Sequence, residues 1–241
     1  MMRGKFLPFL LIFLVAFSCS SPSRRNVIVL CAGDSLTEQG YPPFLRRILK
    51  DNGLTARVLN FGRSGNTSAE YLQFLEKQKD TMAAEHPDVV LLELGTNDLR
   101  LDGDRTTTAD FRRNMERIIG IFRAFRDREG EATRLLLATI PPIPENVAFP
   151  FGLESRERAE NEINPAIRQL AVDNYLSLVD NFAVFLASPH LLPGIHPTEE
   201  GYRLMAENWY KALRELLNLY DSQILIWRDK IVVSFKGKGR D

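Results

Sequence analysis

Hydrophobic residues along the chain fall into short continuous runs, which alternate with longer segments that mix apolar and polar positions. Each run is rich in Val, Leu and Ile and lacks the polar alternation of a half-exposed strand. Such runs are typical of strands that are covered on both faces of a sheet. We predict strands at Asn26–Cys31, Arg57–Phe61, Val89–Leu94, Leu135–Ile140 and Leu176–Val179.

The segments between these runs repeat their apolar residues three and four positions apart, which is the period of an amphipathic helix. The last segment is the clearest, because Tyr202, Met205 and Trp209 follow this period. Thr198 stands directly before it, where an N-cap is expected. We predict helices at Pro43–Asp51, Ser68–Ala84, Ala109–Arg128, Arg156–Asp173 and Thr198–Leu219.

Strands that alternate with helices are joined by right-handed crossovers and form a parallel sheet. We therefore predict an α/β fold with three layers, α/β/α, around a five-stranded parallel sheet. The 241-residue chain has no linker-like break in its middle, so residues 26–220 are expected to form one domain. Residues 221–241 are a C-terminal extension, in which Gln223–Phe235 is apolar and strand-like and has no assigned function.

The first residues of the chain have the features of an export signal. Arg3 and Lys5 precede the apolar run Phe6–Phe17, which is too short to span a bilayer and fits the hydrophobic region of a signal peptide. We interpret residues 1–18 as this signal and expect an exported bacterial protein, either held in the cell envelope or secreted. Cleavage at that boundary leaves Cys19 as the first residue of the mature chain.

The position of Cys19 resembles that of the lipid-carrying cysteine in a bacterial lipobox. Ala16 stands three residues before it, where the lipobox usually has Leu. We predict that lipidated Cys19 attaches the protein to a membrane and that residues 19–25 are a tether; the alternative is simple secretion. With Cys19 lipidated, Cys31 has no partner for an intrachain disulfide, and we expect a buried structural thiol there.

The balance of charge argues against a nucleic-acid-binding protein. The chain has 31 Lys and Arg and 31 Asp and Glu residues, so its formal net charge is zero. The arginines between positions 112 and 128 are interleaved with apolar residues at helical spacing. We interpret them as the solvent-facing side of a helix rather than as a phosphate-binding patch.

Small and polar residues gather after the predicted strands, at the edge where open parallel sheets bind their ligands. Four segments stand out: Gly33–Thr37, Gly62–Thr67, Gly95–Asp98 and Gly194–Pro197. Each by itself is explained by turn chemistry or helix capping. Their occurrence together, in this order and with a histidine just before the last helix, indicates a catalytic site.

The four segments resemble the sequence blocks of the GDSL/SGNH hydrolases, which supply Ser, Gly, Asn and His. The resemblance covers residues 27–216 and implies a flavodoxin-like fold and hydrolysis of carboxylic esters without a metal or organic cofactor. It implies that Ser35 is the nucleophile and His196 its base. The implied oxyanion hole consists of the main-chain N–H groups of Ser35 and Gly65 and the side-chain amide of Asn97.

The sequence departs from the family pattern at one position. The family usually has an Asp three residues before the catalytic His, and that residue is Pro193 here. In subtilisin, loss of the acid costs roughly 10⁴–10⁵ in kcat, against about 10⁶ for loss of the Ser or the His. We therefore expect a Ser–His dyad in which a main-chain carbonyl of residues 192–194 (Leu192, Pro193, Gly194) accepts the Nδ1 proton of His196.

The remaining polar candidates have structural interpretations. Asp34 and Asp98 are expected to fix turns. His86 is expected to be structural or exposed, and His190 to be the same or to line the pocket. The three histidines lack the spacing of metal ligands, and the sequence has no phosphate-loop motif.

Three functions are compatible with these motifs. The leading one is hydrolysis of a small-molecule ester, with an acyl ester, a lysophospholipid or a thioester as substrate. The second is removal of O-acetyl groups from a carbohydrate, and the third is a noncatalytic envelope binding protein on the hydrolase scaffold. The apolar side chains of residues 143–151 suit an acyl chain, whereas the prolines of the same segment suit a stiff surface loop.

Overall fold

The structure, a computed structural model, describes residues 26–103 and 105–236, with side chains as far as residue 217. The predicted signal peptide, the tether of residues 19–25 and Cys19 lie outside the described residues.

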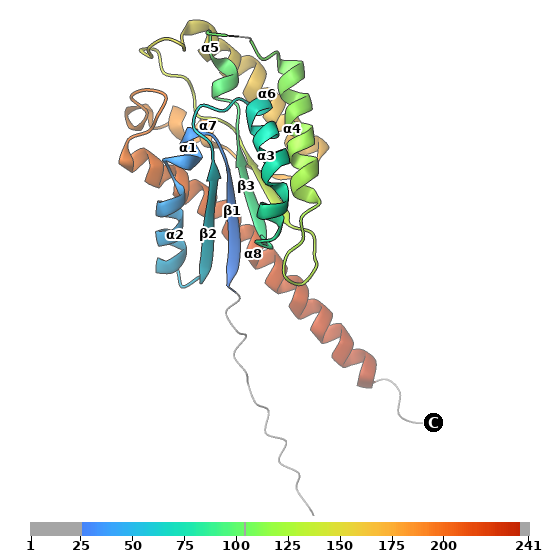
Figure 1. Ribbon diagram of the computed structural model, residues 1–241. Helices are drawn as coiled ribbons and strands as arrows, with labels where there is room; N and C mark the ends of the chain where they lie inside the picture. Colours follow the sequence, from blue (N-terminus) through green and yellow to red (C-terminus); the bar gives the residue numbers. More distant parts are fainter. Residues whose placement is uncertain (1–25, 104, 237–241) are drawn as a thin grey trace, which may run out of the picture.

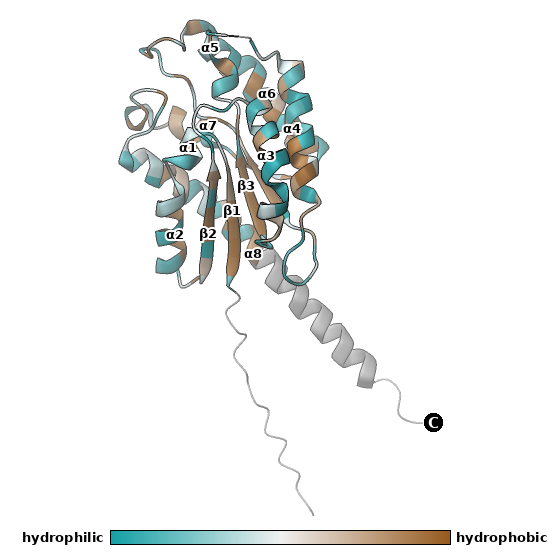
Figure 2. Ribbon diagram, viewed as in Figure 1, coloured by the Kyte–Doolittle hydropathy of each residue, from teal (hydrophilic) through white to brown (hydrophobic). Residues whose placement is uncertain are grey.

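Five parallel strands form the central sheet, in the order β2-β1-β3-β4-β5 (Figure 1). The strands are β1 Val27–Gly33, β2 Ala56–Gly62, β3 Val89–Glu93, β4 Arg134–Ala138 and β5 Ser177–Val179. All residues of the inner strands β1 and β3 are buried, and both strands are hydrophobic along most of their length (Figure 2). The strand order is the flavodoxin-like one, so the predicted three-layer parallel fold is confirmed.

Helices cover both faces of this sheet. They are α1 Ser35–Glu38, α2 Pro42–Asp51, α3 Ser68–Ala83, α4 Thr108–Arg123, α5 Leu153–Arg158, α6 Asn164–Asp173, α7 Asn181–Leu186 and α8 Glu199–Lys236, with short turns η1 Asn97–Leu99, η2 Ala159–Ile163 and η3 Pro189–Leu191. The apolar cluster on one face joins the sheet to α3, α4 and α6, and the cluster on the other joins it to α2 and α8. Neighbouring residues of β1 belong to different clusters: Leu30 is part of the first cluster and Val29 is part of the second.

An aromatic pair fastens α8 to the sheet. Trp209 of α8 stacks on Tyr41, which directly precedes α2, with ring centroids 5.7 Å apart. Both side chains are fully buried. Burial of two large rings is a major packing contribution, and it fixes the first half of α8, the part next to the Gly194–Pro197 segment.

The strand-like interpretation of the C-terminal extension is wrong. The backbone of Gln223–Phe235 continues α8, which runs to Lys236. A short apolar run does not distinguish a strand from a helix, and this one pairs with no strand of the described sheet. Along the described part of the chain, no helix is both long enough and apolar enough to cross a bilayer.

Two other predicted helices differ in their bounds. Helix α4 ends at Arg123, earlier than predicted, because Asp127 accepts main-chain hydrogen bonds from Glu129 and Glu131 and thereby forms a turn. The predicted helix Arg156–Asp173 begins earlier, at Leu153, and it contains the π-helical turn η2 between α5 and α6.

Candidate active site

Ser35 lies in the first turn after β1, at the carboxyl edge of the sheet. Asp34 caps α1, since its Oδ1 accepts a hydrogen bond of 3.0 Å from the N–H of Leu36. This cap fixes the turn that carries Ser35, which is 8% exposed. The prediction that Asp34 fixes a turn is confirmed.

His196 lies in the loop between η3 and α8, and the first turn of α8 holds that loop. Oγ1 of Thr198 accepts a hydrogen bond of 3.1 Å from Gly201, and the Thr198 N–H donates to the Leu191 carbonyl at 2.9 Å. A Cβ on Gly201 would lie 2.6 Å from that carbonyl oxygen, so glycine allows the close approach of helix and loop. In this position, Nε2 of His196 lies 2.9 Å from Oγ of Ser35.

Gly65 belongs to the loop after β2, which packs against α1. The N–H of Ser64 donates to Oε2 of Glu38 at 2.9 Å and ties this loop to the helix that begins at Ser35. Gly65 has a φ of +80°, a conformation that favours glycine, and a Cβ there would meet no atom within 4 Å. The backbone at Gly65 is therefore open to close approach by a ligand.

Asn97 lies at the start of η1, after β3. Its side-chain amide donates a hydrogen bond of 3.1 Å to the carbonyl of Asn66, which leaves a second amide N–H for a ligand. The main-chain N–H groups of Ser35 and Gly65 have no acceptor among the described main-chain hydrogen bonds. Three hydrogen-bond donors are thus available around the hydroxyl of Ser35.

Ser35, Gly65, Asn97 and His196 line one cavity of about 510 Å³, here called the Ser35 cavity. The structure thus brings together the four residues that the sequence singled out. No carboxylate is among the described residues that line this cavity.

The loop between β4 and α5 forms a further part of the wall of the Ser35 cavity. Residues 146–151 line it, and the side chains of Val147 and Phe151 are partly buried against the core. Phe149 of the same loop is 74% exposed. The segment is therefore both an apolar wall and a surface loop, which joins the two interpretations made from the sequence.

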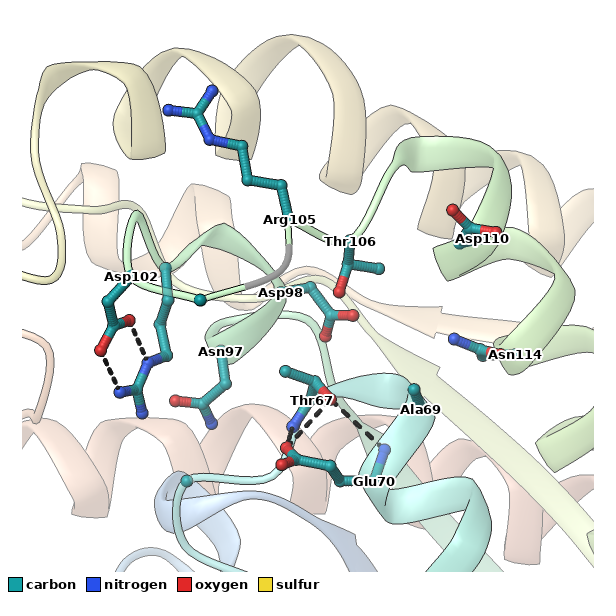
Figure 3. Close-up of a pocket in the computed structure, with 13 residues that line it drawn as sticks. Thr67, Ala69, Glu70, Asn97, Asp98, Asp102, Arg105, Thr106, Asp110 and Asn114 are labelled. Carbon is teal, nitrogen blue, oxygen red and sulfur yellow. Dashed lines mark hydrogen bonds and ion pairs between the residues drawn. The ribbon is translucent and has the colours of Figure 1, made fainter.

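A second cavity, here called the polar cavity, adjoins the first and has a volume of about 670 Å³ (Figure 3). The two cavities share Gly65, Asn97 and Arg100. Its remaining lining comes from the start of α3, the loop before α4 and the first half of α4. The motif blocks of the sequence do not predict it, because most of its residues follow those blocks.

The other ring nitrogen of His196, Nδ1, has no hydrogen-bond partner among the described residues. The Pro193 side chain is exposed. The hydrogen bond expected from Nδ1 to a main-chain carbonyl of residues 192–194 is therefore absent among the described residues, and that expectation is wrong.

Two buried carboxyl groups, those of Asp34 and Glu93, lie near Ser35. Glu93 ends β3 directly opposite Gly33 of β1, and its Oε2 accepts a hydrogen bond of 2.8 Å from Asn181. Burial raises the pKa of Asp34 from its ordinary 3.8 to about 7 and raises the pKa of Glu93 well above its ordinary range. Glu93 is not among the residues predicted from the sequence, although an acidic residue inside an apolar strand run is a visible signal.

The other residues considered in the sequence either have structural roles or lie away from the Ser35 cavity. Asp98, expected to fix a turn, accepts hydrogen bonds from the N–H and hydroxyl of Ser68, at 2.9 and 2.6 Å, and so fixes the start of α3 instead. His86 and His190 are exposed and do not line the Ser35 cavity. Cys31 is fully buried, and burial raises the pKa of its thiol to about 12.

One group of carboxylates in the described part of the chain is close enough to share a cation: Asp88, Asp127 and Glu129. Asp88 directly precedes β3, so the group lies at the edge of the sheet opposite to Ser35. Its carboxylates also hold the protein together, as Asp88 accepts from the N–H of Ile28 and Asp127 from that of Glu129.

Comparison with known proteins assigns this chain to a family. A family model described as "GDSL-like Lipase/Acylhydrolase family" matches residues 31–204. The chain is 30% identical over 219 residues to an acetylxylan esterase of Xylanibacter ruminicola, a match that covers 79% of this chain and 44% of that protein. It is also 30% identical over 196 residues to esterase TesA of Pseudomonas aeruginosa, covering 78% of this chain and 89% of the relative.

A solved structure shares the fold. A carbohydrate acetylesterase family member from Sinorhizobium meliloti superimposes with a TM-score of 0.65 at 22% identity, over 80% of this chain and 99% of that one. The chain spans less than half the length of the Xylanibacter relative. The family model matches most of the chain and includes Ser35, Gly65, Asn97 and His196, and the predicted resemblance is confirmed. The chain belongs to the GDSL-like lipase/acylhydrolase family, whose relatives named above are carboxylic-ester hydrolases.

Proposed function

We propose that this protein hydrolyses carboxylic esters through an acyl-enzyme on Ser35. The observation that carries the proposal is the 2.9 Å contact between Oγ of Ser35 and Nε2 of His196. Serine is a weak nucleophile at neutral pH and needs a base at this distance to accept its proton. A noncatalytic binding protein has no need for this contact together with free donors around the hydroxyl.

The proposed reaction has two halves. First, Nε2 of His196 accepts the hydroxyl proton while Oγ of Ser35 attacks the ester carbonyl, and the N–H donors of Ser35, Gly65 and Asn97 stabilise the oxyanion. His196 then donates that proton to the departing alcohol oxygen, and the acyl group stays on Ser35. Second, His196 accepts a proton from water, which attacks the acyl carbonyl, and return of the proton to Oγ releases the carboxylic acid.

We propose that Ser35 and His196 work as a dyad. The absence of carboxylates among the described residues of the Ser35 cavity and the presence of Pro193 support this proposal. Without a carboxylate the imidazolium that forms is less stabilised, so kcat is expected to be low for a serine hydrolase.

The wall of the Ser35 cavity at Val147 and Phe151 is apolar. This supports a substrate orientation in which the acyl group lies against the β4–α5 loop. The printed name of the Xylanibacter relative supports an O-acetylated carbohydrate as a second candidate substrate. In this chain, the polar cavity favours this second candidate substrate.

A covalent probe tests the proposal. A fluorophosphonate reacts with an activated serine, so we expect a single adduct, located at Ser35 by peptide mass spectrometry. Ser64 also lines the Ser35 cavity and serves as an internal control, because it has no histidine beside it in the described contacts and should stay unlabelled. A protein that stays unlabelled, or one labelled equally at both serines, contradicts the proposal.

We also propose that the protein is exported and anchored to a membrane through lipidated Cys19. The apolar run of residues 6–17 and the position of Cys19 support this. β1 begins at Val27 and leads to Ser35 at its far end, so the first described residues lie at the edge of the sheet opposite to Ser35 (Figure 1). Incorporation of radiolabelled palmitate that is lost in Cys19→Ala is the expected result; equal labelling of both proteins contradicts it.

A further inference from the structure

The polar cavity has the right place for one half of an ester substrate. It shares Gly65, Asn97 and Arg100 with the Ser35 cavity, and two of these are proposed oxyanion donors. An ester carbonyl at those donors therefore lies where the two cavities meet, with the apolar β4–α5 loop lining one cavity and polar side chains lining the other. With the acyl group against the apolar wall, the alcohol part extends into the polar cavity.

The lining of the polar cavity is almost entirely polar. Apart from two glycines, Ala69 is its only residue without a polar side chain among the described residues. Hydroxyl, amide, carboxylate and guanidinium groups all contribute, so the cavity offers both donors and acceptors (Figure 3). Its volume of about 670 Å³ is within the range of about 300–1,000 Å³ that is usual for small-molecule sites.

Both arginines of this cavity are already paired with carboxylates, which argues against a negatively charged alcohol group. Arg100 donates two hydrogen bonds, of 2.8 and 2.7 Å, to the carboxylate of Asp102. Arg105 makes a similar two-point contact with Glu154 of α5. A phosphate head group needs an arginine or lysine that is free to bind it.

The acidic residues of the cavity strengthen this argument. Glu70 and Asp110 line it together with Asp102, so carboxylates outnumber arginines there. Oε2 of Glu70 accepts hydrogen bonds from both the N–H and the hydroxyl of Thr67, which leaves its other oxygen for a ligand donor. Such a lining suits a neutral group that is rich in hydroxyls.

We propose that the polar cavity binds the alcohol part of the substrate and that this part is a neutral polyhydroxylated group, such as a sugar unit that carries a short acyl ester. The inference rests on the proposed ester hydrolysis at Ser35. It makes the polar cavity the determinant of alcohol specificity, while the β4–α5 loop contacts the acyl group.

Two acetate esters that differ only in the alcohol test this assignment. We would measure acetate release from 6-O-acetylglucose and from ethyl acetate and take the ratio of their kcat/KM values. A tenfold preference corresponds to about 1.4 kcal/mol, which about two net hydrogen bonds to the sugar supply, so the protein is expected to prefer the sugar ester by about tenfold or more. Lysophosphatidylcholine, with its charged alcohol part, is expected to react more slowly than the sugar ester.

Ala69→Phe places a ring in the polar cavity and is expected to lower that ratio by about tenfold. Asp102→Leu, an exposed position on the same cavity, is a second variant that tests the inference if the first does not fold. Ala84→Phe, at the exposed far end of α3, is the matched control and should keep the ratio of the unmodified protein.

The outcomes separate this inference from the proposed function. Loss of the sugar preference in Ala69→Phe or Asp102→Leu, but not in Ala84→Phe, supports the polar cavity as the alcohol site. Ser35-dependent hydrolysis of both esters with a ratio near one, or with a ratio that these two variants leave unchanged, overturns the inference and leaves ester hydrolysis intact. Faster hydrolysis of lysophosphatidylcholine than of the sugar ester also overturns it. Absence of any Ser35-dependent hydrolysis overturns both.

Discussion

Nε2 of His196 lies 2.9 Å from Oγ of Ser35, although 161 positions separate the two residues in the chain. β1 brings Ser35 to the carboxyl edge of the sheet, and the capped first turn of α8 holds the loop of His196 at the same edge. The contact is thus built by the two ends of the domain. No carboxylate among the described residues of the Ser35 cavity completes a triad with Ser35 and His196, and the first two predictions concern this third member.

Pro193→Asp is expected to raise kcat for a small ester by at least about tenfold. The change places a carboxylate three residues before His196, where the family usually has one, and the acid of a triad contributes roughly 10⁴ to kcat. Pro193 is exposed, which favours tolerance of the polar side chain. Pro193→Ala is the control for loss of the proline ring, and equal activity of both variants would count against the proposed dyad.

Asp34→Asn and Glu93→Gln are each expected to retain at least about a tenth of the activity. Asp34 caps α1 and Glu93 is bonded to Asn181, and neither lines the Ser35 cavity. A true triad acid is expected to cost roughly 10⁴ instead. The measurement is kcat for each variant, with circular dichroism to verify the fold; a folded variant without activity would identify the acid that the dyad account denies.

Asn97→Ala is expected to lower kcat by roughly 10²–10³ and to change KM little, because the amide acts on the oxyanion rather than on the ground-state ester. Its other hydrogen bond, to the carbonyl of Asn66, is on the loop that carries Gly65. Asn52→Ala, at the exposed end of α2, is the control for an amide lost elsewhere. A change confined to KM would mean that Asn97 binds substrate without stabilising the oxyanion.

Asp34→Asn is also expected to change how stability depends on pH. Burial raises the pKa of Asp34 in the folded protein from 3.8 to about 7, so the folded state holds a proton that the unfolded state has lost between these values. The free energy of unfolding therefore falls as pH rises from about 4 to about 7, by at most about 4 kcal/mol from this group. The amide of Asn does not titrate, so the Asp34→Asn variant does not lose stability in this way as pH rises.

Urea unfolding at pH 4.5 and pH 8 measures this difference. The variant is expected to gain stability relative to the unmodified protein at pH 8 but not at pH 4.5. Asp51→Asn, at the exposed end of α2, is the matched control. An equal effect of Asp34→Asn at both pH values would show that the carboxyl is ionised in the folded state throughout.

Much of the fold could be predicted because the strands and helices have distinct periodicities. The inner strands are continuous apolar runs, and the parallel α/β alternation leaves few topologies. The C-terminal extension was misjudged because an apolar run such as Gln223–Phe235 is ambiguous without its neighbours. The early end of α4 depends on a carboxylate-bonded turn at Asp127, which periodicity does not reveal.

The site was predicted where residues lie directly at strand ends. Ser35, Gly65 and Asn97 follow three strands, and the carboxyl ends of parallel strands meet at one edge. The polar cavity escaped prediction because Ala69, Asp102 and Arg105 come from a helix start and a loop whose meeting depends on tertiary packing. Glu93 escaped because its partner, Asn181, lies 88 positions away.

Hydrolysis of p-nitrophenyl acetate and p-nitrophenyl hexanoate by the purified protein, by Ser35→Ala and by His196→Ala measures whether these two residues carry out ester hydrolysis. We expect slow but measurable turnover, lowered at least about 100-fold by either substitution, as for a serine hydrolase that works without a triad acid. Turnover that both variants retain, or no turnover of either ester by the unmodified protein, would contradict this expectation.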